Sequence, residues 1–239
     1  MTPRTKEQNE EIRLRRLVQI RKAAADVFLN KGPLLEIRDV AVQAGLGYGT
    51  VYHYYSNKGD LLHDLLWDAL DRAGEWLEVP RASASGEAPA GGHFGLAAAA
   101  DTGNSAAADS RGGSRETAAA AELAPVAAAG FRLLQLWAED HALYLLFKLA
   151  GEGFASLPEA RSVPLSAAFR REVLAPLAAL LETGRAADGA AASGGNAAEP
   201  PLLLRAEMLL AALVGCASLS LRRGKLHEEA RDIARFLKL

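Results

Sequence analysis

The chain has 239 residues, of which 50% are hydrophobic and 6% aromatic, so it can bury the core of one large domain or two small ones. Its net charge is −2, so affinity for nucleic acid must come from a local basic patch; residues 1–60 hold 10 Lys and Arg against 7 Asp and Glu. The single cysteine, Cys216, excludes a disulfide within the chain and a multi-cysteine metal site, and we expect no metal and no cofactor.

The polar start of the chain, residues 1–16, has no apolar region of the secretory kind. The longest apolar run covers residues 208–221 and is 14 residues long, which is too short to span a bilayer and suits a buried core helix. We therefore expect a cytoplasmic protein without membrane contact.

Apolar residues recur at steps of three and four along most of the chain, which is the period of an amphipathic helix. The pattern predicts a first helix that ends near Gly32–Pro33, a second that ends at Gly45, a short third over 50–55, and a fourth that Asp60 caps. No segment alternates like a strand bounded by hairpin turns. The predicted fold class is all-α.

Five later helices are predicted over residues 120–138, 141–151, 164–183, 202–223 and 226–238. Asp140 suits a helix cap, Pro164 suits a first turn, and Pro176 should kink or shorten its helix. Residues 79–118 and 185–201 are rich in Ala, Gly and Ser and have too few large apolar residues to offset the entropy of ordering, so we expect flexible loops there.

The glycines of "GLGYGT", residues 45–50, alternate as if to cradle a nucleotide phosphate. A dinucleotide fingerprint needs a strand before the motif and a third glycine where this chain has Thr50. A helix-turn-helix fits instead: Ala41 permits a close helix crossing, and Gly45 can take a positive φ in a turn of three to four residues. The helix after the turn is then the one that enters the DNA major groove.

Residues 12–70 resemble the DNA-binding domain of tetracycline-repressor (TetR) type transcriptional regulators. Ten positions carry the family pattern: Ala44, Gly45, Leu46, Gly49, Thr50, Val51, Tyr52, Tyr54, Tyr55 and Lys58. Beyond residue 78 the resemblance is to the helical plan only. It implies a three-helix helix-turn-helix DNA-binding domain over residues 1–59 and a helical-bundle ligand-binding and dimerisation domain over residues 60–239.

The candidate DNA-binding residues surround the turn and the helix after it: Arg38, Gly47, Tyr48, Gly49, Thr50, Tyr52, His53, Tyr54 and Lys58. Gly49 lets the helix approach the sugar-phosphate backbone, and Thr50 offers its hydroxyl and amide to a phosphate. The lysine and the tyrosine hydroxyls would fix the register on phosphates. Tyr48 and His53 occupy variable positions, so they are candidates for base contacts, although His53 could equally be solvated.

Two positions depart from the family pattern. Glu36 stands where Ser or Thr usually caps the second helix and touches a phosphate, and Gly47 stands where the turn usually has Ser. Because Glu36 repels a phosphate, DNA affinity at that end should weaken unless Arg38 compensates. Tyr55 is expected to pack in the core.

The resemblance implies an effector pocket and a dimer interface in the second domain. The helix at 202–223 is apolar around most of its circumference, and the helix at 226–238 has an apolar face, so we expect a four-helix homodimer interface across a two-fold axis. The candidate pocket residues are Phe131, Trp137, His141, Tyr144 and Phe147, and Phe154 is expected on the helices around them. Core packing is the alternative for each, and a mostly apolar pocket suits a small, lipophilic effector.

Together these features predict a dimeric repressor that binds double-stranded DNA at a palindromic operator and is released by a small-molecule effector. One alternative is a DNA-binding regulator of the same fold without an effector, controlled by a protein partner; another is an architectural protein. An enzyme is disfavoured, because the five histidines form no H-E-x-x-H pair and no G-x-S-x-G elbow occurs.

Overall fold

The computed structural model describes residues 5–74, 125–187 and 201–237, and within these ranges the chain is helical and contains no strand. The predicted all-α class is therefore confirmed. The predicted loop at 79–118 lies outside the described residues, as does 188–200 of the predicted loop at 185–201; residues 185–187 belong to a helix instead.

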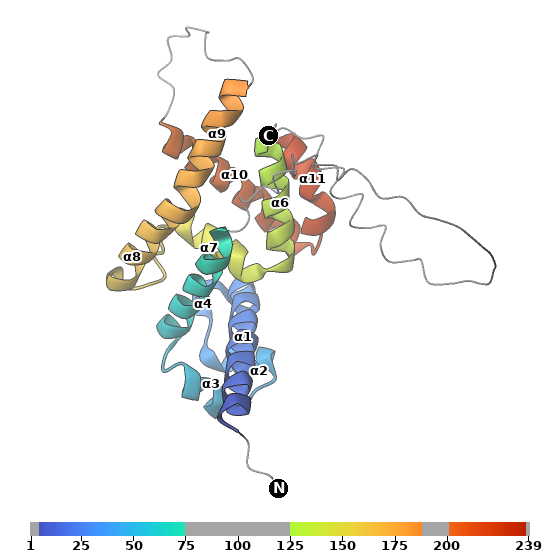
Figure 1. Ribbon diagram of the computed structural model, residues 1–239. Coiled ribbons are helices and arrows are strands. Elements are labelled where there is room, and N and C mark those ends of the chain that lie inside the picture. The colour runs from blue at the N-terminus through green and yellow to red at the C-terminus, as the bar shows by residue number, and fades with distance from the viewer. Residues whose placement is uncertain (1–4, 75–124, 188–200, 238–239) are drawn as a thin grey trace, which may run out of the picture.

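Four helices form the N-terminal part: α1 (Lys6–Lys31), α2 (Ile37–Ala44), α3 (Tyr48–Tyr54) and α4 (Lys58–Ala73). A capping box at Thr5 starts α1, and α2 packs against α1 through contacts that include Gln19–Ala44 and Lys31–Asp39. Ile20, Val40 and Val51 are fully buried and join α1, α2 and α3 in one core. Figure 1 shows α1, α2 and α3 grouped at one end of the molecule.

The fourth helix starts differently from the sequence prediction. Asn57, and not Asp60, is its N-cap: the Asn57 side chain accepts a hydrogen bond at 2.9 Å from the Asp60 amide. The Asp60 carboxylate instead pairs with Arg161 of α8 at 2.5 Å. The predicted cap was wrong because Asp60 is the third residue of the helix, past the capping position, and its carboxylate accepts from the side chains of Asn57 and Arg161.

Six helices form the rest of the described chain: α6 (Pro125–Glu139), α7 (His141–Gly151), α8 (Glu159–Phe169), α9 (Ala175–Ala187), α10 (Leu202–Arg222) and α11 (Leu226–Phe236). Asp140 caps α7 as predicted, accepting hydrogen bonds from the amides of Ala142 and Leu143. α7 lies between the two halves, because it packs against α1 and α4 on one side and against α6 and α10 on the other.

The predicted helix at 164–183 is two helices joined by a π-helical turn. α8 begins at Glu159 after Pro158, so Pro164 lies inside the helix and the predicted first-turn position was wrong. The π-helical residues 170–174 precede Pro176, which has no amide hydrogen to continue the regular bonding pattern. Pro176 therefore marks the irregularity that the sequence indicated.

α10 and α11 differ in how their apolar sides are covered. Buried positions on α10 form one stripe, Ala206, Leu210, Leu213, Ala217 and Ser220, and the opposite side is exposed. The buried residues of α11 are Leu226, Ala230 and Ala234, and α11 packs against α6 of the same chain (Figure 1). The sequence did not show that α6 covers this face, because that depends on long-range packing.

By length and composition alone, α10 could also cross a membrane, with a mean hydropathy of 1.8 over its most apolar 18 residues. No other helix in the described part of the chain meets that test. Only 22% of the window is buried inside the protein, although one stripe of the helix packs against α6, α7, α9 and α11. The exposed apolar surface of α10 is therefore available to a partner.

Candidate DNA-binding surface and effector cavity

A glycine in the left-handed conformation makes the turn between α2 and α3. Gly45 has φ 64° and ψ 32°, and its amide bonds to carbonyls at the end of α2. The Leu46 amide then donates to the Ala41 carbonyl at 2.9 Å, which closes the turn over a buried alanine. α3 therefore leaves the turn at a fixed angle, as the helix-turn-helix prediction requires.

The helix after the turn begins at Tyr48, two residues earlier than predicted, so Gly49 and Thr50 lie in its first turn. Gly47 is the N-cap and has no side chain to satisfy the first amides. Residues 47–50 are all exposed. This end of α3 is accessible to a large partner such as a DNA duplex.

Two tyrosines form a pair on the exposed side of α3. The ring centroids of Tyr48 and Tyr52 are 4.5 Å apart, and these residues are 54% and 41% exposed. A side-chain hydrogen bond with Tyr52 raises the pKa of Tyr48, so the Tyr48 phenol is a neutral hydrogen-bond donor at neutral pH. His53 is exposed beside the half-buried Tyr54, with ring centroids 5.5 Å apart.

The two candidate cations already have partners. The Lys58 ammonium donates to the Pro33 carbonyl at 3.0 Å and keeps two further donors. The Arg38 guanidinium pairs with Glu36 at 2.9 Å, and both side chains are mostly exposed. Arg38 thus neutralises the acidic residue at the start of α2 through its Nε, and its two terminal nitrogens keep donors for a phosphate.

Tyr55 lies in the core, as expected, and it anchors the end of α3. Its hydroxyl donates to the Asp64 carboxylate, which also accepts from Arg21 of α1 at 2.8 Å. Arg21 in turn reaches Asp68 at 2.5 Å. Burial disfavours the charged form of Asp64, but the hydrogen bonds from Arg21 and Tyr55 hold the pKa of Asp64 below its usual range. For Tyr55, burial raises the pKa of the hydroxyl. The sequence analysis missed this network, because residues 43 and 47 positions apart show no local pattern.

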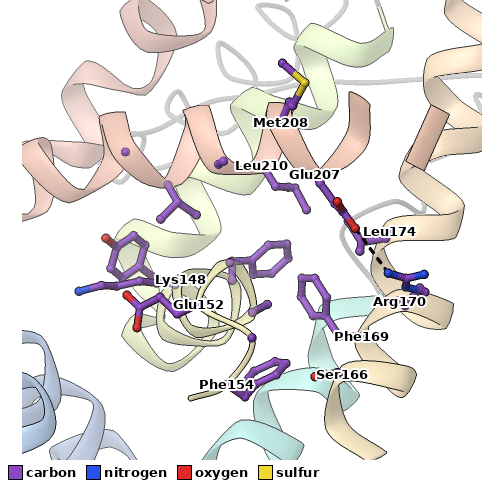
Figure 2. Close-up of a pocket in the computed structure, with 18 of the residues that line it drawn as sticks. Lys148, Glu152, Phe154, Ser166, Phe169, Arg170, Leu174, Glu207, Met208 and Leu210 are labelled. Atoms are coloured by element: carbon purple, nitrogen blue, oxygen red, sulfur yellow. Dashed lines mark ion pairs between the residues drawn. The ribbon is translucent and has the colours of Figure 1, made fainter. Parts of the chain in front are cut away.

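A cavity of about 830 Å³ lies between α7, the α7–α8 connection, α8 with the π-helical turn, and α10. Figure 2 shows Phe154, Phe169, Leu174 and Leu210 around it. Its polar rim includes Lys148, Glu152 and an ion pair of 3.8 Å between Arg170 and Glu207, drawn as a dashed line in Figure 2. The volume and lining suit a mostly apolar small molecule.

Residues 20–65 match the family model described as bacterial regulatory proteins, tetR family. The N-terminal domain is therefore that of the TetR family. This confirms the resemblance of the N-terminal domain to the helix-turn-helix domain of TetR-type DNA-binding regulators. No curated protein matches the sequence.

Several solved structures are similar to this chain at low sequence identity. The fatty acid degradation regulator FadR from Bacillus halodurans is 16% identical, with a TM-score of 0.50 over 92% of this chain and 93% of that one. The FadR structure from Bacillus subtilis in complex with stearoyl-CoA is 19% identical, with a TM-score of 0.49 over 92% and 96%. The TetR family regulator PfmR from Thermus thermophilus is 15% identical, with a TM-score of 0.48 over 98% and 95%.

The structure divides the five predicted pocket residues between two cavities and the core. Tyr144 and Phe147 line the large cavity, whereas His141 lines a smaller one. Phe131 and Trp137 line neither cavity. The Arg231 guanidinium carbon lies over the Phe131 ring, 6.0 Å from the ring centroid, and Trp137 is fully buried in the core. A 3.6-residue period shows that a side chain faces inward, but not whether it meets another side chain or a void.

Phe154, which was expected near the pocket, and Phe169, which the prediction omitted, complete the aromatic wall of the cavity. Phe154 has a φ of 54°, a strained value for a bulky residue, and follows Gly153, which also has a positive φ. The pair turns the chain back after α7 so that the Phe154 ring packs 6.2 Å from that of Phe169. Phe154 therefore lies in the connection after α7 and not on a helix as expected.

Proposed function

We propose that this chain is a dimeric transcriptional repressor that a small-molecule effector releases from a palindromic operator. The DNA-binding domain would comprise residues 1–59, and the ligand-binding and dimerisation domain residues 60–239. The observation that carries the proposal is the pairing of an exposed recognition helix with an apolar cavity of about 830 Å³ on the other side of α7.

At the operator, the exposed start of α3 would face the major groove. Thr50 and Lys58 would hold phosphates, because both are exposed beside the first turn of a helix and carry donors. Tyr48 and His53 would face base edges or thymine methyl groups. The Tyr48–Tyr52 contact limits the conformations of Tyr48 before binding, which lowers the entropy lost on docking.

The exposed side of α10 would form the dimer interface. Leu204, Met208 and Leu219 are 43%, 59% and 64% exposed and lie on one face, where Gly215 leaves room for a second helix to approach. Since α6 covers the apolar side of α11, α10 is the main contributor. A two-fold dimer would present its recognition helices to half-sites about 34–36 Å apart.

Two contacts would connect the cavity to the DNA-binding helices. The Asp140 cap of α7 pairs with Arg72 of α4, and His141 lies 2.6 Å from Asp26 of α1. α7 also supplies Tyr144 and Phe147 to the cavity. An effector that binds better to a shifted position of α7 would therefore move α1 and α4 and change the spacing of the recognition helices.

A gel shift on the intergenic DNA upstream of the chain's own gene tests the proposal. We expect one retarded band with two protomers per palindromic site, and loss of the band with Thr50→Ala. Compounds that enter the large cavity should weaken the complex. Monomeric protein on the DNA, or undiminished binding by Thr50→Ala, would contradict the proposal.

A further inference from the structure

A second cavity, of about 320 Å³, lies where the DNA-binding helices meet the regulatory half. Residues of four helices line it: Asp26, Leu29 and Asn30 of α1, Gln43 of α2, His141, Tyr144 and Lys148 of α7, and Ser218, Leu221 and Arg222 of α10. Three of these residues, Tyr144, Lys148 and Ser218, also line the large cavity. The two cavities are therefore neighbours that share a wall.

The order of lining residues shows that the cavities lie end to end along one groove between α7 and α10. The small cavity takes residues 141–148 of α7 and 218–222 of α10, whereas the large one takes 144–151 and 207–218. The two helices thus run in opposite directions on either side of the groove. At 1.5 Å per residue, the ten steps from His141 to Gly151 span about 15 Å. That length accommodates an extended molecule.

The two ends of the groove differ in chemistry. The far end is aromatic and aliphatic, and its Arg170 is already paired with Glu207. The end against α1 is polar and contains Lys148 and Arg222, neither of which forms an ion pair within the described residues. Asp26 is the only acidic residue that lines this cavity, and its Oδ1 lies 2.6 Å from Nδ1 of His141. The junction end therefore offers two positive charges to a ligand.

Tyr144 stands at the boundary between the two ends. It is 1% exposed, and its hydroxyl has no hydrogen-bond partner of normal geometry among the described residues. Burial raises the pKa of Tyr144, and Ser218 and Arg222 oppose the shift only in part. The hydroxyl therefore stays protonated and can donate to an acceptor in the groove.

We propose that the effector is an amphipathic oxyanion. This inference rests on the function proposed above. Its apolar body would lie among Phe147, Phe154 and Phe169. Its carboxylate or phosphate would accept from Tyr144 and pair with Lys148 and Arg222 in the junction cavity. The same head group would then adjoin α1 and α2, so ligand binding would act directly on the position of the DNA-binding helices.

Binding of three probes to the full chain tests the inference: dodecanoate, dodecyl phosphate and dodecanol. Each probe is titrated against the protein with a bound environment-sensitive dye, and displacement of the dye gives its affinity. We expect at least one anion to bind tenfold or more tightly than the alcohol, and the better anion identifies the head group. Lys148→Gln and Arg222→Gln should each weaken that anion several-fold and leave dodecanol unchanged. Tyr144→Phe should weaken it as well, and Arg171→Gln, which removes an exposed cation outside both cavities, is the matched control.

Equal binding of all three probes, equal losses in the variants for the alcohol and the anions, or no binding of any probe would overturn the oxyanion inference. In the first two cases the large cavity still binds an apolar ligand, and the proposed function stands. If the anions bind as expected but leave the operator complex intact in a gel shift, the oxyanion site stands and the effector role in the proposed function fails. The two failures are thus distinguishable.

Discussion

Substitution of Asp64 by Asn tests whether the Arg21–Asp64–Tyr55 network holds the recognition helix. Asp64 accepts from two partners, and its side chain is 38% exposed, whereas that of Arg21 is 19% exposed. A hydrogen bond to a charged group contributes about 1.5–3 kcal/mol, and Arg21 retains Asp68 after the change. With a discount for the exposure, we expect Asp64→Asn to lower the free energy of unfolding by about 2 kcal/mol.

Urea denaturation followed by circular dichroism measures this loss as a lower midpoint with an unchanged slope. Asp71→Asn on the exposed side of the same helix is the control and should stay within about 0.5 kcal/mol. The folded-state pKa of Asp64 lies below the unfolded one, so its contribution is complete above about pH 4 and declines as the pH falls through the folded value. A midpoint for Asp64→Asn equal to that of wild type at pH 7 would refute the reasoning.

Four further outcomes are expected. Lys58→Ala should weaken binding to all DNA sequences and reduce the salt slope by about one unit, so an unchanged slope would exclude a phosphate contact. Tyr48→Ala should alter sequence preference in an operator titration; an equal loss of affinity for all sites would show that Tyr48 makes no base contact. Met208→Asp should convert the dimer to monomer in size-exclusion chromatography with light scattering, and an intact dimer would place the interface elsewhere. Gly45→Ala should destabilise by about 1 kcal/mol through its positive φ alone, since an added Cβ meets nothing within 4 Å; thermal unfolding at the wild-type temperature would contradict this.

Several features were determined by interactions within a few residues. The left-handed Gly45, the Asp140 cap and the motif from Ala44 to Lys58 all depend on local backbone bonding, so the sequence predicted the all-α class, the turn and the recognition helix. Pro176 likewise indicated an irregularity, because proline lacks the amide hydrogen that the regular helical hydrogen bond needs at that position.

Long-range packing decided the rest. The pattern at 164–183 could not show that α8 starts at Glu159, because the residues that cover it come from elsewhere in the chain. Asp is a residue type that commonly caps helices, and only the folded chain showed that Asp60 pairs with Arg161 instead. The same limit applies to the cavity: Trp137 and Phe147 follow the same helical period, yet one fills the core and the other faces a void. The sequence determines which side of each helix is apolar, but the void arises where three helices and a loop fail to fill the space between them, and that depends on all of them at once.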